Sequence, residues 1–313
     1  MSLQVIINQM LIIFLLMLLG AVLNKRKIIT VEGSRELSNL IMTVLNPAII
    51  ISGSLSKERA GSMQDVVISA GLAFAMYAFF VLLGFIIPRL CRCERKDDAV
   101  YNLMTIFSNI GFIGIPVVAA VFGKGAVIFV TMYNLPYNLL IYTYGVYLMT
   151  KDKNTKNGEK GRQNGFQIRS FFSPGTIASI AGIVIFAAGI QLPEVFSSSI
   201  DYLANATTAL SMLVIGVSLA QMSVRDIFRN GRLYVFCVIR MILVPILAIW
   251  ILRPLISNPV VYQVAVILIA MPVGSLPVIM ATKYDADVTL ASRGVILSTC
   301  LSVFTVPLVS LFF

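Results

Sequence analysis

The distribution of apolar residues constrains this chain more than any other feature. Hydrophobic residues make up 58% of the 313 residues, and charged residues only 12%. A helix needs roughly 20 consecutive, mostly apolar residues to span a bilayer. The sequence contains ten such runs, which predict an all-α polytopic membrane protein: 4–23, 37–56, 65–88, 99–122, 125–149, 174–192, 201–220, 232–252, 260–282 and 289–312.

The loops between these runs differ in their content of Lys and Arg. Most basic residues fall in alternate loops, whereas the intervening loops carry only Lys57, Arg59, Lys124 and Arg253. Short cytoplasmic loops collect positive charge, so we expect the basic loops to face the cytoplasm. Both termini then lie outside a cytoplasmic (inner) membrane. The net charge of +10 is spread over five loops rather than gathered on one face, which argues against a nucleic-acid partner.

A long polar stretch, Lys151 to Ser170, divides the ten runs into five and five. Two consecutive repeats with an odd number of spans each must have opposite orientations in the membrane. The predicted organisation is a first five-helix repeat (1–150), a cytoplasmic loop (151–172) and a second, inverted repeat (173–313). Cys91 and Cys93 fall in a cytoplasmic loop and Cys237 and Cys300 in spans, so no disulfide framework is expected.

Two runs are interrupted at corresponding places of the two halves. The fourth contains "SNIGFIGIPV" (108–117), and the ninth contains "MPVGSLP" (271–277). Proline removes a backbone donor, and the freed polar groups persist in a membrane only where they line a wet cavity or meet another segment. Each half-helix N-terminus would offer unpaired N–H groups to an anion. The alternative is that these residues only bend two helices for packing.

These motifs carry a resemblance to a known family. "NIGFIGIP" (109–116) resembles the fourth-helix crossover of auxin efflux carriers, and "AMPVGSLPVIMATKYDADVTLAS" (270–292) resembles their ninth helix and following loop. "SPGTIASIAG" (173–182) and "LSMLVIGVSLA" (210–220) look like their sixth and seventh helices. The resemblance covers nearly the whole chain and is closest to the bacterial malate and malonate permease branch.

The resemblance implies two inverted five-helix repeats, as in bile-acid sodium symporters, with broken helices 4 and 9 crossing. Helices 1, 2, 6 and 7 would form a scaffold, and helices 3–5 and 8–10 the moving part. The implied activity is alternating-access transport, of the elevator type, of carboxylates such as malate, malonate or auxin-like acids. The short central loop departs from the plant pattern and leaves auxin itself open.

The candidate substrate-binding residues lie at the interruptions and in the second and fifth runs. An amide such as that of Asn109 can donate to a carboxylate and is costly to bury unpaired. The candidates are Asn46, Pro47, Asn109, Gly111, Gly114, Pro116, Asn134, Tyr137, Asn138, Pro272, Gly274, Ser275 and Pro277. Asp65 and Arg240 are candidate charge or coupling residues, although Asp65 also reads as a solvated interfacial carboxylate and Arg240 as a side chain that extends to the cytoplasmic surface.

Composition also limits the chemistry. The chain has no histidine, and no acidic residue lies near the middle of a run, which disfavours a buried proton relay and His-based or metalloprotease catalysis. We therefore expect a transporter and no enzyme, with a small organic anion and the lipid bilayer as partners and without a cofactor or bound metal. Coupling to Na⁺ or H⁺, import or export, a homodimer, and the alternatives of a channel or a non-transporting receptor stay open.

Overall fold

The computed structural model describes residues 3–56, 60–150, 173–221 and 231–313. The predicted cytoplasmic loop 151–172 lies outside these residues. The first half contains α1 (Leu3–Lys25), α2 (Val31–Leu40), η1 (Ile41–Leu45), α3 (Asn46–Leu55), α4 (Met63–Leu90), η2 (Arg95–Asp97), α5 (Asp98–Ile106), η3 (Ile110–Gly114), α6 (Ile115–Phe122), η4 (Lys124–Ala126), α7 (Val127–Leu140) and η5 (Ile141–Gly145).

The second half is also helical. It contains α10 (Pro174–Ala188), α11 (Glu194–Ala220), α13 (Gly231–Val238), η6 (Ile239–Leu243), α14 (Val244–Leu252), α15 (Pro259–Ala270), α16 (Leu276–Lys283) and α17 (Val288–Ser310). Seven continuous helices of the described chain are long and apolar enough to span a membrane, and three shorter apolar helices accompany them. The prediction of an all-helical protein with several membrane-crossing helices is therefore confirmed.

Three predicted boundaries were wrong by several residues. The second run, predicted as 37–56, begins at Val31, where Thr30 caps the helix by accepting a hydrogen bond from the N–H of Gly33. The seventh, predicted as 201–220, begins at Glu194, because a serine-rich turn too polar for an apolar run is still helical. The sixth, predicted as 174–192, stops at Ala188, because Gly189 adopts a left-handed conformation that ends the helix.

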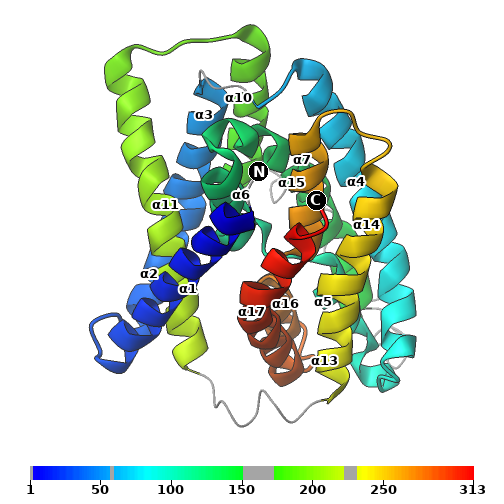
Figure 1. Cartoon of the computed structure of the whole chain (residues 1–313). Helices are drawn as coiled ribbons and strands as arrows, with labels where there is room; N and C mark the ends of the chain where they lie inside the picture. Colours follow the sequence, from blue (N-terminus) through cyan, green and yellow to red (C-terminus); the bar gives the residue numbers. More distant parts are fainter. Residues whose placement is uncertain (1–2, 57–59, 151–172, 222–230) are drawn as a thin grey trace.

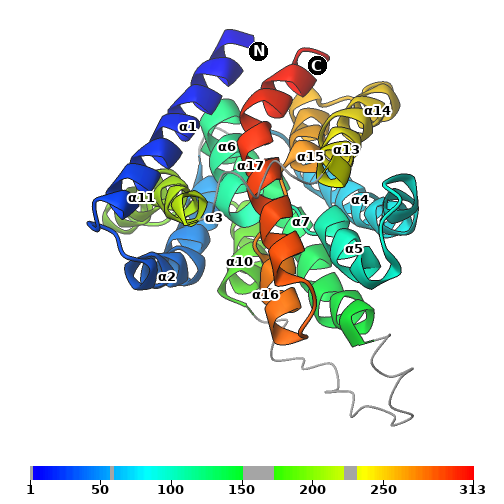
Figure 2. The same ribbon diagram turned by 90° about the horizontal axis from the view of Figure 1, so that it is seen from below.

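The helices form two groups that lie side by side (Figures 1 and 2). α1, α2, α3 and α11 lie on one side, and α4, α5, α13, α14 and α15 on the other. Large apolar side chains are exposed on the outside of both groups, among them Leu15 on α1, Leu82 on α4 and Trp250 on α14. An apolar outer surface is what a bilayer solvates, so these helices face lipid tails.

Small residues let α1 and α11 approach closely. A Cβ atom added to Gly216 would lie 1.9 Å from the carbonyl oxygen of Met17, and one added to Gly20 would lie 2.2 Å from that of Leu213. Neither distance is compatible with any side chain larger than hydrogen. Packing through small residues is common between membrane helices, because close backbone approach replaces the missing hydrophobic driving force.

Two helical stretches are interrupted, and the interruptions meet. The chain leaves helical geometry between α5 and η3, at Phe107–Asn109, and again between α15 and α16, at Met271–Ser275. The N–H of Asn109 donates to the carbonyl of Pro272 at 2.8 Å, and the N–H of Gly274 donates to the carbonyl of Phe107 at 2.9 Å. This short antiparallel bridge, centred on Ser108 and Val273, satisfies backbone groups that hydrocarbon could not.

The interruption of the fourth stretch precedes its proline. Pro116 follows a π-helical turn, and the N–H of Ile115 donates to the carbonyl five residues earlier. Pro47 and Pro245 follow π turns in the same way. Widening the turn relieves the clash between the proline ring and the carbonyl four residues before it. Pro116 therefore widens a helix that has already restarted, and the break itself lies at Phe107–Asn109.

Candidate functional site

Two cavities flank the point where the interrupted helices meet. One, of about 390 Å³, lies between α11, α16 and α17, and the other, of about 270 Å³, is lined from α3, α7 and α10 as well as from both interruptions. Asn109, Phe112, Ser275 and Ile279 line both cavities. Within the described chain neither lining includes a charged residue, so an anion here would depend on neutral donors.

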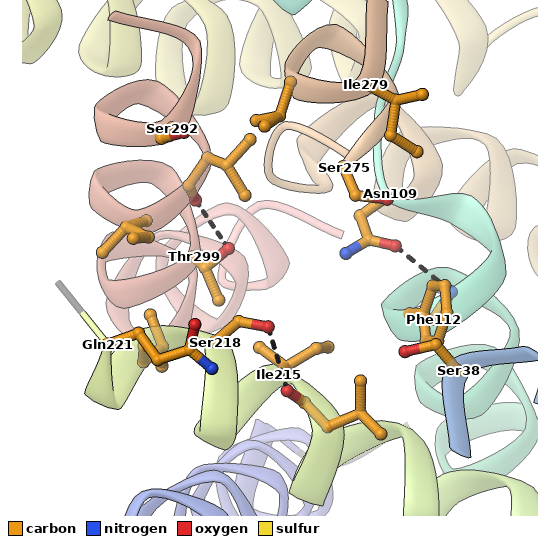
Figure 3. Close-up of a pocket in the computed structure, with 15 residues that line it drawn as sticks. Ser38, Asn109, Phe112, Ile215, Ser218, Gln221, Ser275, Ile279, Ser292 and Thr299 are labelled. Atoms are coloured by element: carbon orange, nitrogen blue, oxygen red, sulfur yellow. Dashed lines mark hydrogen bonds between the residues drawn. The ribbon is translucent and has the colours of Figure 1, made fainter. Parts of the chain in front are cut away.

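Asn109 offers a donor to the cavity. Its side-chain oxygen accepts a hydrogen bond from the N–H of Phe112 at 3.2 Å, which caps η3. The amide nitrogen points the other way, into the larger cavity, as Figure 3 shows. The cap therefore orients the amide, and an acceptor in the cavity such as a carboxylate would meet two N–H groups.

The starts of η3 and α16 add backbone donors. The N–H of Gly111 belongs to the first turn of η3, and that of Leu276 to the first turn of α16, where no carbonyl of the same helix can accept them. Both residues line the smaller cavity. Two helix N-termini, each carrying about half a positive charge, therefore meet at one place, which is an environment suited to a single anion.

The amides contributed by neighbouring helices are not equivalent. Asn46 lines the smaller cavity, and its Nδ2 atom would lie 3.4 Å from a Cβ added to Gly111. Its Oδ1 atom is buried and accepts no hydrogen bond from the described residues. Asn138, by contrast, donates to the hydroxyl of Thr176 at 2.8 Å and to the carbonyl of Asn134 at 3.0 Å. Both protons of its amide are thus used within the protein.

Asn134 and Tyr137 also line the smaller cavity. Asn134 donates to the hydroxyl of Ser179 on α10 at 3.3 Å. The ring of Tyr137 packs edge-on against that of Phe107, with centroids 5.4 Å apart. Asn134, like Asn138, therefore ties α7 to α10, and Asn109 has a freer donor than either.

The other predicted residues shape the site without lining it. Pro47, Gly114, Pro116, Pro272 and Pro277 line neither cavity.

Asp65 lies at the start of α4, where its carboxylate accepts hydrogen bonds from the N–H of Ser62 at 2.8 Å and from the hydroxyl of Ser62 at 3.0 Å. This arrangement is a capping box, and it lies away from both cavities.

Arg240 lies in the π turn η6 and is 1% exposed. Its guanidinium group donates to the carbonyls of Thr105, at 2.9 Å, and of Ile269, and to the hydroxyl of Ser108. The side chain therefore does not extend to the surface, which was one of its two sequence interpretations. Its guanidinium group lies at the meeting point of the interrupted helices, on the side where α5 and α15 end.

Sequence reasoning missed several residues that line the cavities. Ser108 lines the smaller one, and five polar residues line the larger: Ser38, Ser218, Gln221, Ser292 and Thr299. Isolated hydroxyls occur in most membrane helices, where they bond to their own backbone, as those of Ser218 and Thr299 do here. Only the position of Ser108, next to Asn109 in the same motif, could have marked it in advance.

The cysteines show no sign of a metal or redox site. No group of His, Cys, Asp or Glu suitable for a metal ion occurs in the part of the chain that the structure describes. Burial, reinforced by the neighbouring Cys91, raises the pKa of the Cys93 thiol to about 11. This thiol therefore stays protonated and weakly nucleophilic at neutral pH.

Several long apolar helices with an apolar outer surface, accompanied by two interrupted helices, define a polytopic membrane protein. The chain belongs to the membrane transport protein family, whose model matches residues 5–310, and the resemblance to auxin efflux carriers is thereby confirmed.

Curated relatives of the chain are transporters. It is 26% identical to an uncharacterized transporter of Methanothermobacter thermautotrophicus, over 95% of this chain and 94% of the relative. It is 23% identical to an uncharacterized transporter of Methanocaldococcus jannaschii, over 95% and 96%. It is also 22% identical to a putative malonate transporter of Rhizobium meliloti, over 77% of this chain and 74% of the relative.

Proposed function

We propose that this protein is a secondary transporter that moves small organic anions across the cytoplasmic membrane by alternating access. The observation that carries the proposal is the meeting of two helix N-termini beside Asn109, whose amide nitrogen points into a cavity. Uncharged donors of this kind can bind a carboxylate without holding it too tightly to release. The putative malonate transporter among the relatives supports a carboxylate substrate.

We further propose that the chain forms ten membrane crossings in two inverted repeats, with α1, α2, α3, α10 and α11 as the scaffold. The remaining helices would move as an elevator. The grouping in Figure 1 supports this division, because α1, α2, α3 and α11 lie on one side and α4, α5, α13, α14 and α15 on the other. Lys124, which begins η4 in the moving part, pairs with Asp201 of α11 at 3.0 Å, a contact that would break when the elevator moves.

The function is tested with purified protein in proteoliposomes. Uptake and counterflow of labelled malonate and of a panel of mono- and dicarboxylates are measured with and without Na⁺ and with and without a pH gradient. Saturable uptake with counterflow supports the transporter. Currents far above carrier rates without counterflow would indicate a channel, and tight binding without uptake would indicate a receptor.

The orientation is tested independently in cells. A tag inserted at Gly158, in the predicted cytoplasmic loop, is expected to be reached by antibody only after the membrane is permeabilised. Access from outside in intact cells would invert the proposed topology, in which both termini lie outside. Whether the protein forms a homodimer follows from cross-linking in the same membranes.

A further inference from the structure

Arg240 is the largest fully buried side chain of the described residues, and no carboxylate among them pairs with it. Its partners are two backbone carbonyls and one hydroxyl. The face of its guanidinium group lies over the ring of Phe80, 3.9 Å from the centroid. A buried cation needs compensation, so these uncharged groups must provide it.

Both carbonyls belong to the C-terminal ends of the interrupted helices. Thr105 lies in the last turn of α5, which ends at Ile106, and Ile269 lies in the last turn of α15, which ends at Ala270. Carbonyls in a last turn lack partners within the helix, and each helix end carries about half a negative charge. Two such ends together balance about one positive charge, which Arg240 supplies.

The opposite side of the meeting point has the opposite sign. There the N-termini of η3 and α16 together carry about one positive charge, and Asn109 and Gly111 offer their donors to the cavities. Because Arg240 already neutralises the negative ends, and neither cavity lining contains an acidic side chain among the described residues, this positive side has no counter-charge in the described part of the chain. A ligand with one negative charge would complete the balance.

Ser108 connects the two sides. Its hydroxyl oxygen accepts a hydrogen bond from Arg240, and the residue lines the smaller cavity between Asn109 and the second interruption. Because the guanidinium group occupies the acceptor side of this oxygen, the hydroxyl proton is left to donate elsewhere. A carboxylate in the cavity is the acceptor that best fits this donor.

We propose that Arg240 is a built-in cation at the meeting point of the interrupted helices, where it takes the place of an inorganic ion between the C-termini of α5 and α15. Through its hydrogen bond it also orients the Ser108 hydroxyl toward one carboxylate group of the substrate. The inference rests on the proposed transport of organic anions. Arg240 is then a positioning residue, and Ser108 contacts the substrate. Anion binding by the intact chain needs no Na⁺ at this place, because the guanidinium group already occupies the oxygens that Na⁺ would use.

The cation site can be tested without a transport assay. In Arg240→Ala, low-millimolar guanidinium chloride is expected to raise the melting temperature of the purified protein, because the free ion refills the site, whereas sodium chloride at equal ionic strength serves as the reference. Wild-type protein and Arg89→Ala, which removes an exposed arginine from the end of α4, are expected to show no such rise. A folded Arg240→Ala protein that does not respond to guanidinium overturns the built-in cation.

The link to the substrate is tested by malonate uptake in proteoliposomes. Ser108→Ala removes one hydrogen bond to a charged group and is expected to raise KM about tenfold or more, with a smaller change in kcat. Guanidinium is expected to restore part of the uptake by Arg240→Ala. An unchanged KM in Ser108→Ala, or wild-type binding that requires Na⁺, overturns the proposal.

Two further comparisons separate the possible failures. If Arg240→Ala cannot be purified, Arg240→Lys keeps the charge but cannot reach all three acceptors, so it is expected to fold and to show a raised KM; a wild-type KM would contradict the positioning role. If the wild-type protein takes up no carboxylate at all, the proposed function fails, while the guanidinium response of Arg240→Ala still decides the cation site.

Discussion

Replacing Asn109 separates its two structural roles. The side-chain oxygen caps η3 through the N–H of Phe112, and the amide nitrogen points into the cavity. Asn109→Asp keeps an oxygen for the cap and replaces the donor by a negative charge. Asn109→Ser also keeps a cap, without the charge, whereas Asn109→Ala loses both functions.

The expected magnitudes differ between these variants. Loss of the cap in Asn109→Ala should reduce the free energy of unfolding by about 0.5–2 kcal/mol, and the Ser and Asp variants should stay closer to the wild type. Loss of a donor to a carboxylate costs about 1.5–3 kcal/mol of binding free energy, which corresponds to a roughly 10- to 150-fold weaker affinity. Asn109→Asp should be weaker still, because its charge repels the anion.

The assay is malonate uptake in proteoliposomes, normalised to folded protein, together with thermal unfolding in detergent. The expected order of affinity is wild type, then Ser and Ala, then Asp, while the order of stability places Ala last. Malonate affinity in Asn109→Asp equal to that of the wild type would refute the assignment of this amide to the anion. Equal stability of the Ala and Ser variants would refute the capping argument.

Three further predictions follow from other parts of the fold. Gly216→Ala should destabilise the protein by about 1–3 kcal/mol in thermal unfolding, because the added methyl group disturbs the α1–α11 contact. Gly71→Ala is the control and should not destabilise it, because a Cβ there meets nothing within 4 Å. Similar melting temperatures of the two variants would contradict the close approach of α1 and α11. Lys124→Gln breaks a partly exposed ion pair with Asp201. The free energy of unfolding should change by less than about 1 kcal/mol, but the turnover of uptake should change. An unchanged turnover would argue against a contact that breaks when the proposed moving part moves. Burial raises the pKa of the Cys93 thiol to about 11, so roughly one thiol in a thousand is ionised at pH 8. Maleimide labelling of Cys93, followed by mass spectrometry, should therefore be slow at pH 8 and accelerate as the pH rises. Rapid labelling of Cys93 at neutral pH would contradict the raised pKa.

The sequence by itself determined that the chain is a helical membrane transporter and where its apolar helices lie. Run length, hydropathy and Gly/Pro punctuation are local properties, so they can be read without knowing what packs against what. The same properties marked Asn109 and the segment at 271–277 as unusual. They could not locate the break, because Pro116 and Pro245 both follow π turns of the same kind within continuous helices. Only the pairing of Ser108 with Val273 explains why helical geometry ends where it does.

Only the tertiary structure decided what the polar residues do. From the sequence, Asn109 and Asn138 are both candidates for the substrate site, and Arg240 could have reached the surface. In the fold, Asn138 donates both amide protons, to Thr176 and to Asn134. Arg240 donates to the carbonyls of Thr105 and Ile269, which are 135 and 29 positions away in the sequence. Hydrogen bonds between distant segments depend on how the helices pack, and a single sequence does not encode that packing in any local pattern.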